Sequence, residues 1–272
     1  MKRKHFLNLL MNLNPEKNKP FYAKKAVLIE MLNKSISGET LTYNDYVKLV
    51  NCIHVSALTG KLEEFYSISS CVAENDICKA RARDCNSICH QCYAMQSVEY
   101  RSNLRLTLLI NHIVLNCFDI PVSAWSLLAV PTINGKARIE SHGDVASIQA
   151  ALNMNRIIES HEWIDFGIWT KNYNFWRIAF DRDGKHKNCT FLVSSDRLNK
   201  QLEIPANIAK YVDHVFTVYD FKTVKAENID IHCGFHHCIN CGICYDTNNK
   251  QFYVNEILKK DNKRYMKYMG IE

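Results

Sequence analysis

Ala137-Arg138-Ile139-Glu140-Ser141-His142-Gly143-Asp144 is the stretch that decides the fold, because a strand ends in it and a helix begins just after it. The stretch follows an Asn134-Gly135 turn, and its first five residues read as a short strand. Residues 146–159 then carry apolar side chains at helical spacing, and residues 164–170 read as the next strand. A strand, a helix and a strand in this order predict a βα unit with two parallel strands.

The same alternation continues on both sides of this unit. Further strands are expected at residues 63–70, 189–195, 214–219 and 251–256, with a helix around residues 175–180. Strands separated by helices predict an α/β fold with a mainly parallel sheet. We interpret the sheet as partial (β/α) barrel-like, with an N-terminal helical region and a C-terminal cysteine-rich metal-binding segment.

Three regions are expected along the chain. Residues 1–60 form a helical N-terminal region, residues 61–220 the core of βα units, and residues 221–272 a cysteine-rich segment with a basic helix near Ile257 to Met269. In the first region, Thr42 is expected to cap a helix over Asp45–Leu58. In the second, a long loop is expected over residues 71–88 and one helix over residues 93–118.

The composition is that of a folded protein, with 47% hydrophobic and 23% charged residues. No apolar run reaches the roughly 18 to 20 residues that a membrane span needs, so no membrane partner is expected. The N-terminal segment lacks the small-residue cleavage site of a secretory signal, which favours a cytoplasmic protein with reduced thiols. The net charge of +6 permits nucleic acid as a partner without requiring it.

Two short windows contain seven of the 12 cysteines. The first window is Cys85, Cys89 and Cys92, and the second is Cys233, Cys238, Cys241 and Cys244. Short spacings let several thiolates converge on one soft or borderline metal, so both windows are candidate metal sites. The run Cys238-x2-Cys241-x2-Cys244 is typical of bacterial ferredoxins, which bind 4Fe–4S clusters, and paired C-x2-C ligands are also ordinary in zinc ribbons.

Several polar residues follow the predicted strands directly. Four segments are expected at the carboxyl ends of parallel strands, where they would line one opening of the fold. They are the first cysteine window and residues 142–144, 170–172 and 194–196. Gly143, Asp144 and Ser194 are the candidate cofactor-binding residues among them. Asp144 has a second interpretation, as the cap of the helix that follows.

Cys85-x3-Cys89-x2-Cys92-Tyr93 resembles the cluster loop of radical S-adenosylmethionine enzymes, and the string Cys89-His90-Gln91-Cys92-Tyr93 is similar to the spore photoproduct lyase branch. The resemblance implies that three cysteines hold a 4Fe–4S cluster whose fourth iron binds S-adenosylmethionine. It also implies that Gly143 and Asp144 contact the methionine part and Ser194 the ribose or carboxylate. The second window would then hold an auxiliary cluster.

The chain also resembles phage and plasmid proteins of the gene product eighty-eight type. Those proteins share elements that match Cys92-Tyr93-Ala94 and Trp169-Thr170-Lys171, and a strand that ends in Ser-Gly-Asp. The agreement runs from about Cys71 to Cys244 and supports the architecture more than a reaction.

Two hypotheses of function stay open. The first is an iron–sulfur enzyme of the radical S-adenosylmethionine type, with an unknown substrate and an electron donor as partners. The second is a non-catalytic zinc or iron–sulfur module that binds nucleic acid or a protein, in which Cys71, Cys78 or His90 closes the first site. Three further cysteines are expected in the core, namely Cys52, Cys117 and Cys189. Ligation of the second metal by a nearby histidine, His232, His236 or His237, is the less favoured alternative.

Overall fold

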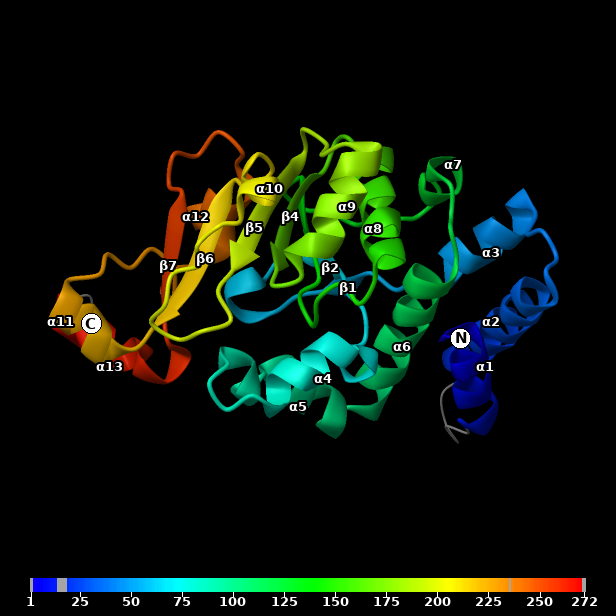
Figure 1. Cartoon of the computed structure of the whole chain (residues 1–272), viewed down its shortest axis with the longest axis horizontal. Coiled ribbons are helices and arrows are strands. Elements are labelled where there is room, and N and C mark those ends of the chain that lie inside the picture. The colour runs from blue at the N-terminus through cyan, green and yellow to red at the C-terminus, as the bar shows by residue number, and fades with distance from the viewer. Residues whose placement is uncertain (1, 14–18, 235, 271–272) are drawn as a thin grey trace.

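The computed structural model describes residues 2–13, 19–234 and 236–270. Seven strands form one sheet in which the spatial order follows the chain order (Figure 1). β1 pairs with β2 antiparallel, and every later pair is parallel. The strands are β1 Ser56–Ala57, β2 Tyr66–Ile68, β3 Lys136–Ile139, β4 Asp165–Thr170, β5 Cys189–Ser194, β6 His214–Tyr219 and β7 Tyr253–Ile257.

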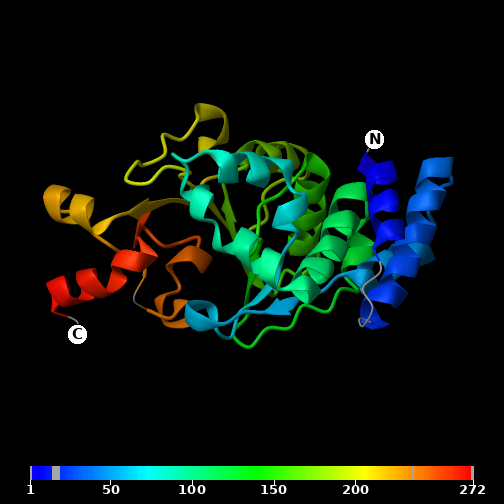
Figure 2. The same ribbon diagram turned by 90° about the horizontal axis from the view of Figure 1, so that it is seen from below.

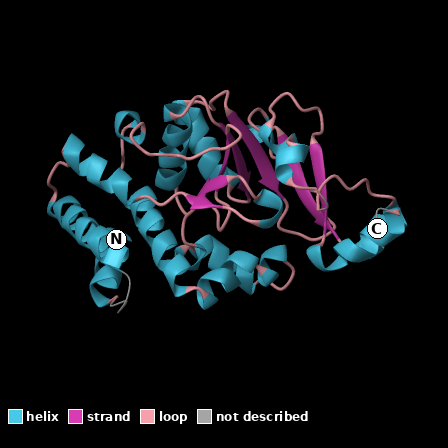
Figure 3. Ribbon diagram, turned by 180° about the vertical axis from the view of Figure 1, so that it is seen from behind, coloured by secondary structure: helices cyan, strands magenta, loops and turns pink. Residues whose placement is uncertain are grey.

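Helices surround this sheet (Figures 1 and 3). The N-terminal helices and the helices α11 and α13 lie at opposite ends of the long axis of the molecule. The α-helices are α1 Lys2–Asn12, α2 Lys19–Ser37, α3 Tyr43–Cys52, α4 Asp76–Arg83, α5 Tyr93–Tyr100, α6 Ser102–Cys117, α7 Val122–Trp125, α8 Ile148–Ser160, α9 Tyr173–Asp183, α10 Ala206–Ala209, α11 Phe221–Glu227, α12 Cys238–Cys241 and α13 Asn262–Met269. Short 3₁₀ helices are η1 Gly60–Leu62, η2 Val72–Glu74, η3 Ile88–Gln91, η4 Ile243–Tyr245 and η5 Lys259–Asp261.

The parallel strands β2 to β7 place all their carboxyl ends at one edge of the sheet. Helices α4 and α5 lie across that edge, as the view from below shows (Figure 2). The prediction of an α/β fold with a mainly parallel sheet is confirmed. Among the described residues no pairing joins β1 to β7, so the sheet is open.

The main core lies between the sheet and the helices α8 and α9. Ile139, Ile168 and Phe191 are register partners on β3, β4 and β5, and all three are fully buried. Trp176 and Phe180 of α9 pack on Phe191. Cys52, Cys117 and Cys189 are buried as predicted, so burial raises the pKa of each thiol.

Helix α3 is shorter than the helix predicted over Asp45–Leu58. Thr42 does cap it, through a reciprocal capping box with Asp45, but the helix ends at Cys52 rather than at Leu58. The following backbone turns away because Asn111 of α6 binds both the N–H and the C=O of His54. Ser56 and Ala57 then pair with β2 as an edge strand.

Residues 71–118 also differ from the prediction. The expected loop contains α4, which begins after Asn75 because the Asn75 side chain accepts hydrogen bonds from the N–H groups of Ile77 and Cys78. The single helix expected over residues 93–118 is two helices, α5 and α6, which meet at Arg101 in a non-helical conformation. These breaks let the chain fold back across the strand ends.

The C-terminal strand pairs with β6 in parallel and belongs to the same sheet. The basic helix expected from residue 257 begins at Asn262, because Ile257 is still part of β7. Within residues 2–13, 19–234 and 236–270, no helix has the length and apolar character needed to cross a membrane.

Candidate active site and cysteine windows

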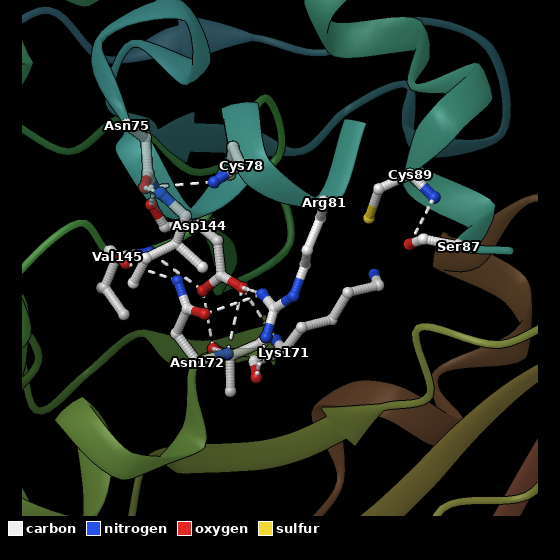
Figure 4. Close-up of polar contacts among 11 residues, drawn as sticks. Asn75, Cys78, Arg81, Ser87, Cys89, Asp144, Val145, Lys171 and Asn172 are labelled. Carbon is white, nitrogen blue, oxygen red and sulfur yellow. Dashed lines mark hydrogen bonds and ion pairs between the residues drawn. The ribbon is translucent and has the colours of Figure 1, made fainter. Parts of the chain in front are cut away.

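A buried carboxylate, that of Asp144, organises the carboxyl edge of the sheet (Figure 4). Its Oδ1 accepts hydrogen bonds from the Thr170 hydroxyl at 2.6 Å and the Val145 N–H at 2.9 Å. Its Oδ2 accepts from the N–H groups of Lys171 at 2.7 Å and Asn172 at 3.2 Å. Burial raises the pKa of Asp144, and the hydrogen bonds from Thr170 and Lys171 oppose that shift by stabilising the charged form.

The interpretation of Asp144 as a helix cap is wrong. Ser147 caps α8 instead, through a hydrogen bond from the Ala150 N–H to its hydroxyl. Asp144 joins the end of β3 to the end of β4.

Helix α4 is clamped to the same turn by Arg81. The Arg81 guanidinium donates to Asn172 Oδ1 at 2.7 Å and to the Lys171 carbonyl at 2.9 Å, and it lies 3.8 Å from Asp144 Oδ2. Asn75, which caps α4, donates to the Asp144 carbonyl at 2.7 Å. Sequence reasoning missed Arg81 because the helix that carries it was expected to be a loop.

Glu140 is a second buried carboxylate at this edge, and it was not among the predicted site residues. It adopts a left-handed conformation with φ of 57° directly after β3. Its oxygens accept hydrogen bonds from the Ser70 hydroxyl at 2.6 Å and the Ser70 N–H at 3.0 Å. Burial raises its pKa to about 7. A Cβ on Gly143 would lie 3.2 Å from Glu140 Oε2, so only glycine fits here without a shift.

A pocket of about 370 Å³ opens beside these groups. One wall is the face of α4 that carries Ile77 and Arg81, and the other walls come from the turn after β4 and the end of β5. Lys171, Phe175, Ser194 and Asp196 line it. The structure therefore brings Ser194 and the Lys171 turn into one pocket, whereas Gly143 and Asp144 are not among its lining residues. Among the described residues the Lys171 ammonium has no ion-pair partner.

The first cysteine window is attached to this pocket by its backbone. The Ile88 N–H donates to the Asp196 carbonyl at 2.9 Å, and Ser87 forms an isolated bridge with Arg197. Tyr93 donates a hydrogen bond to the Ser141 carbonyl after β3. Figure 4 shows the Cys89 sulfur and the Lys171 side chain on the same side of Arg81.

The thiols of this window differ in exposure. Cys85 is exposed, whereas Cys89 and Cys92 are half-buried. Of the three residues considered as a fourth ligand, Cys78 is the one whose pKa responds to the charges of Cys89 and Cys92. Burial raises the pKa of Cys78, and the nearby negative charges of Asp144, Glu140, Cys89 and Cys92 raise it further.

The other two candidates for the fourth ligand have different surroundings. Cys71 is fully buried in an apolar cluster with Val72 and Leu108, and burial raises its pKa to about 11. His90 is exposed, and its Nδ1 lies 2.9 Å from the Ala82 carbonyl oxygen.

The second window forms a separate, smaller pocket of about 30 Å³. All four of its cysteines line that pocket, together with His232 and His236. Burial raises the pKa of Cys244, and the thiolates of the other three cysteines raise it further, so the four sulfurs lie within electrostatic range of one another. Tyr245 anchors the window to the sheet by packing on Phe65 and Trp169.

Within residues 2–13, 19–234 and 236–270, no three His, Cys, Asp or Glu side chains are arranged to hold a metal ion as they stand. The metal-binding role of the seven cysteines therefore stays a prediction. The donor set of the second window fits a metal, since four sulfurs face one pocket. In addition, the neighbouring Arg138 has a buried Nε with no hydrogen-bond partner among the described residues.

The fold and these sites define a class of α/β protein with a polar pocket at the strand ends and two cysteine windows. The family model of gene product 88 matches residues 34–265, which is most of the chain. The chain therefore belongs to the gene product 88 family, and the phage-type resemblance is confirmed. No curated protein and no solved structure matches the chain at a significant level.

Proposed function

We propose that this protein is an iron–sulfur enzyme of the radical S-adenosylmethionine type with an auxiliary cluster. The observation that carries the proposal is the convergence of three elements at one edge of a sequentially ordered parallel sheet. These elements are the first cysteine window, whose Ile88 N–H binds the Asp196 carbonyl, the turn over residues 140–144, and Ser194, which lines a pocket of about 370 Å³ together with Asp196. Such a strand order suits a partial barrel, which carries its active site at the carboxyl ends of the strands.

In this proposal Cys85, Cys89 and Cys92 hold three irons of a 4Fe–4S cluster. When bound, that cluster supplies the electron that cleaves the sulfonium of S-adenosylmethionine. The protein binds and orients the cofactor in the pocket and keeps water away from it. Ser194 and Lys171 are the pocket groups that can contact its ribose and carboxylate.

The contacts at the strand ends refine the role of two residues. Both carboxylate oxygens of Asp144 already accept two hydrogen bonds each, so Asp144 positions the turn rather than contacting the cofactor. Gly143 lets the backbone approach Glu140 and Ser70 closely. Glu140, whose pKa is raised to about 7, is then the carboxyl group at this edge that can take up a proton when a ligand binds.

The proposal is tested on protein purified without oxygen. We expect about eight irons per chain for two 4Fe–4S clusters, and 5′-deoxyadenosine after reduction in the presence of S-adenosylmethionine. A variant without Cys89 and Cys92 should keep about half the iron and form no 5′-deoxyadenosine. Protein that contains only zinc, or that carries iron but forms no 5′-deoxyadenosine, would refute the proposal.

A second candidate function is favoured by the position of Cys78. If Cys78 closes the first site as a fourth ligand, the protein is a non-catalytic metal module. The basic helix α13, with Lys263, Arg264 and Lys267, is then a candidate contact for nucleic acid.

The two functions make opposite predictions for Cys78→Ser. An open iron site keeps its cluster in this variant and still cleaves S-adenosylmethionine, whereas a closed site loses its metal. Nucleic-acid binding that weakens steeply with salt and persists without S-adenosylmethionine would support the second function.

A further inference from the structure

Three basic side chains surround the second cysteine window, and each comes from a distant part of the chain. Lys61 Nζ of η1 lies 3.6 Å from Cys233 Sγ. Lys136 Nζ lies beside Gly242, at 3.7 Å from the position that a Cβ would occupy there. Arg138 of β3 lies close enough to Cys238 and Cys244 for its charge to act on both thiols.

Arg138 is held in place by its stacking on an aromatic ring. Its guanidinium stacks on the Trp169 ring at 4.1 Å, and Trp169 packs edge-on against Tyr245, next to Cys244. Its Nε is buried and has no hydrogen-bond acceptor among the described residues. A buried cationic N–H without an acceptor is costly, so an anionic acceptor is expected beside it.

The charges around the window do not cancel while the thiols are neutral. Glu256 is the carboxylate in contact, because it pairs with Lys61 and lies 3.8 Å from Cys233 Sγ. Three cations and one carboxylate leave a local charge of about +2. Four thiolates around one divalent metal ion, or around an oxidised iron–sulfur cluster, carry a charge of about −2.

His232 is engaged outside the sulfur group. Its Nδ1 accepts from the Asn255 N–H at 3.3 Å, and its Nε2 lies 3.2 Å from Asp230. Both ring nitrogens therefore already have partners, and the four sulfurs are sufficient ligands for a tetrahedral site.

We infer that the second window binds its metal as four thiolates, and that Lys61, Lys136 and Arg138 balance the charge of this dianionic centre. His232, whose two ring nitrogens already have partners, is not a ligand. The inference rests on the proposed metal at this window, but not on the reaction proposed for the first window. The cations hold the metal in place, and for an iron–sulfur cluster they also raise the reduction potential, because positive charge stabilises the more negative reduced state.

The test uses the full metal-loaded chain, purified without oxygen. Lys61→Met and Arg138→Gln each remove one balancing charge, and Glu256→Gln removes the opposing one. Lys48→Met and Arg182→Gln are matched controls on distant surface helices. We expect metal release from the second window to a chelator to become about tenfold faster or more in Lys61→Met and Arg138→Gln, and to stay unchanged in the controls.

The Glu256→Gln variant distinguishes an effect of charge from an effect of misfolding. It should slow metal release and raise the potential, whereas Lys61→Met should lower the potential, and general loss of the fold cannot produce opposite signs. A variant that replaces His232, His236 and His237 by alanine should keep its full metal content. Loss of metal from that variant, or release from Lys61→Met and Arg138→Gln at the control rate, would overturn the inference.

The outcomes separate this inference from the proposed function. Charge-dependent metal retention without formation of 5′-deoxyadenosine supports the inference and removes the enzyme proposal. If 5′-deoxyadenosine forms but metal release from the second window does not depend on these charges, the enzyme proposal is supported and the inference is overturned.

Discussion

The two cysteine windows differ in what surrounds them. The first lies at the carboxyl ends of the strands, beside a pocket of about 370 Å³, and its Cys85 is exposed. The second lines a pocket of about 30 Å³ and is surrounded by basic side chains. An open pocket suits a site that admits a small molecule, whereas a small pocket with balancing charges suits a closed metal centre. Similar cysteine spacings therefore occur in two different surroundings in this chain.

The largest expected effect tests the difference between the two windows by removing cysteines of the first. Replacement of Cys89 and Cys92 by alanine should abolish formation of 5′-deoxyadenosine, because the remaining Cys85 cannot hold a cluster alone. Iron and absorbance from the second window should remain. Cys52→Ala with Cys117→Ala is the control, since both thiols lie in the apolar core. Equal loss of metal from both windows would mean that they are not independent.

A smaller effect concerns Glu140, the buried carboxyl directly after β3. Its pKa of about 7 lies above its ordinary value of 4.5, so the folded state binds the proton more tightly than the unfolded state. This contribution to stability is complete below about pH 4.5 and is lost as pH rises through about 7. The lost contribution is up to about 3 kcal/mol.

Glu140→Gln should remove this pH dependence and make the protein more stable than wild type at pH 8. Urea unfolding at pH 5 and pH 8 measures the change, and Glu162→Gln on the surface is the control. An equal slope of stability with pH in Glu140→Gln and wild type would contradict the assignment.

The sequence predicted those parts of the site that depend on local pattern. Cysteine spacing identified both windows, and the strand-end rule placed Asp144, Lys171 and Ser194 at one edge. Arg81 was missed because α4 is short and begins at an asparagine cap within a polar stretch. Lys61 could not have been found, because it meets Cys233 across 172 residues of chain. Long-range pairing of this kind leaves no periodic signal.

A third prediction concerns the attachment of the second window to the sheet. A Cβ on Gly167 of β4 would lie 2.7 Å from the Trp169 ring and 2.8 Å from the Tyr245 ring. Gly167→Ala should therefore destabilise the protein by about 1–3 kcal/mol and loosen the second window, because overpacking displaces the rings. Metal release from that window and urea unfolding measure both effects.

The control for Gly167→Ala is the same change in a Tyr245→Leu background. If Tyr245 is the group displaced, the cost of the alanine should be smaller there, as in a double-mutant cycle. An equal cost in both backgrounds would place the strain on Trp169 alone.

The smallest expected effect tests the first pocket through Lys171. Its side chain lines the pocket, and its ammonium has no ion-pair partner within the described part of the chain, so it is available to a carboxylate of a bound molecule. Lys171→Met should weaken binding of S-adenosylmethionine about fivefold, corresponding to about 1 kcal/mol for a half-exposed ion pair. Lys200→Met, an exposed lysine of the loop after β5, is the matched control. Metal release from the second window should not change in either variant, because its balancing charges lie elsewhere. If Lys171→Met altered that release as Lys61→Met is expected to do, the two windows would share one electrostatic environment, and the contrast between an open site and a closed one would fail.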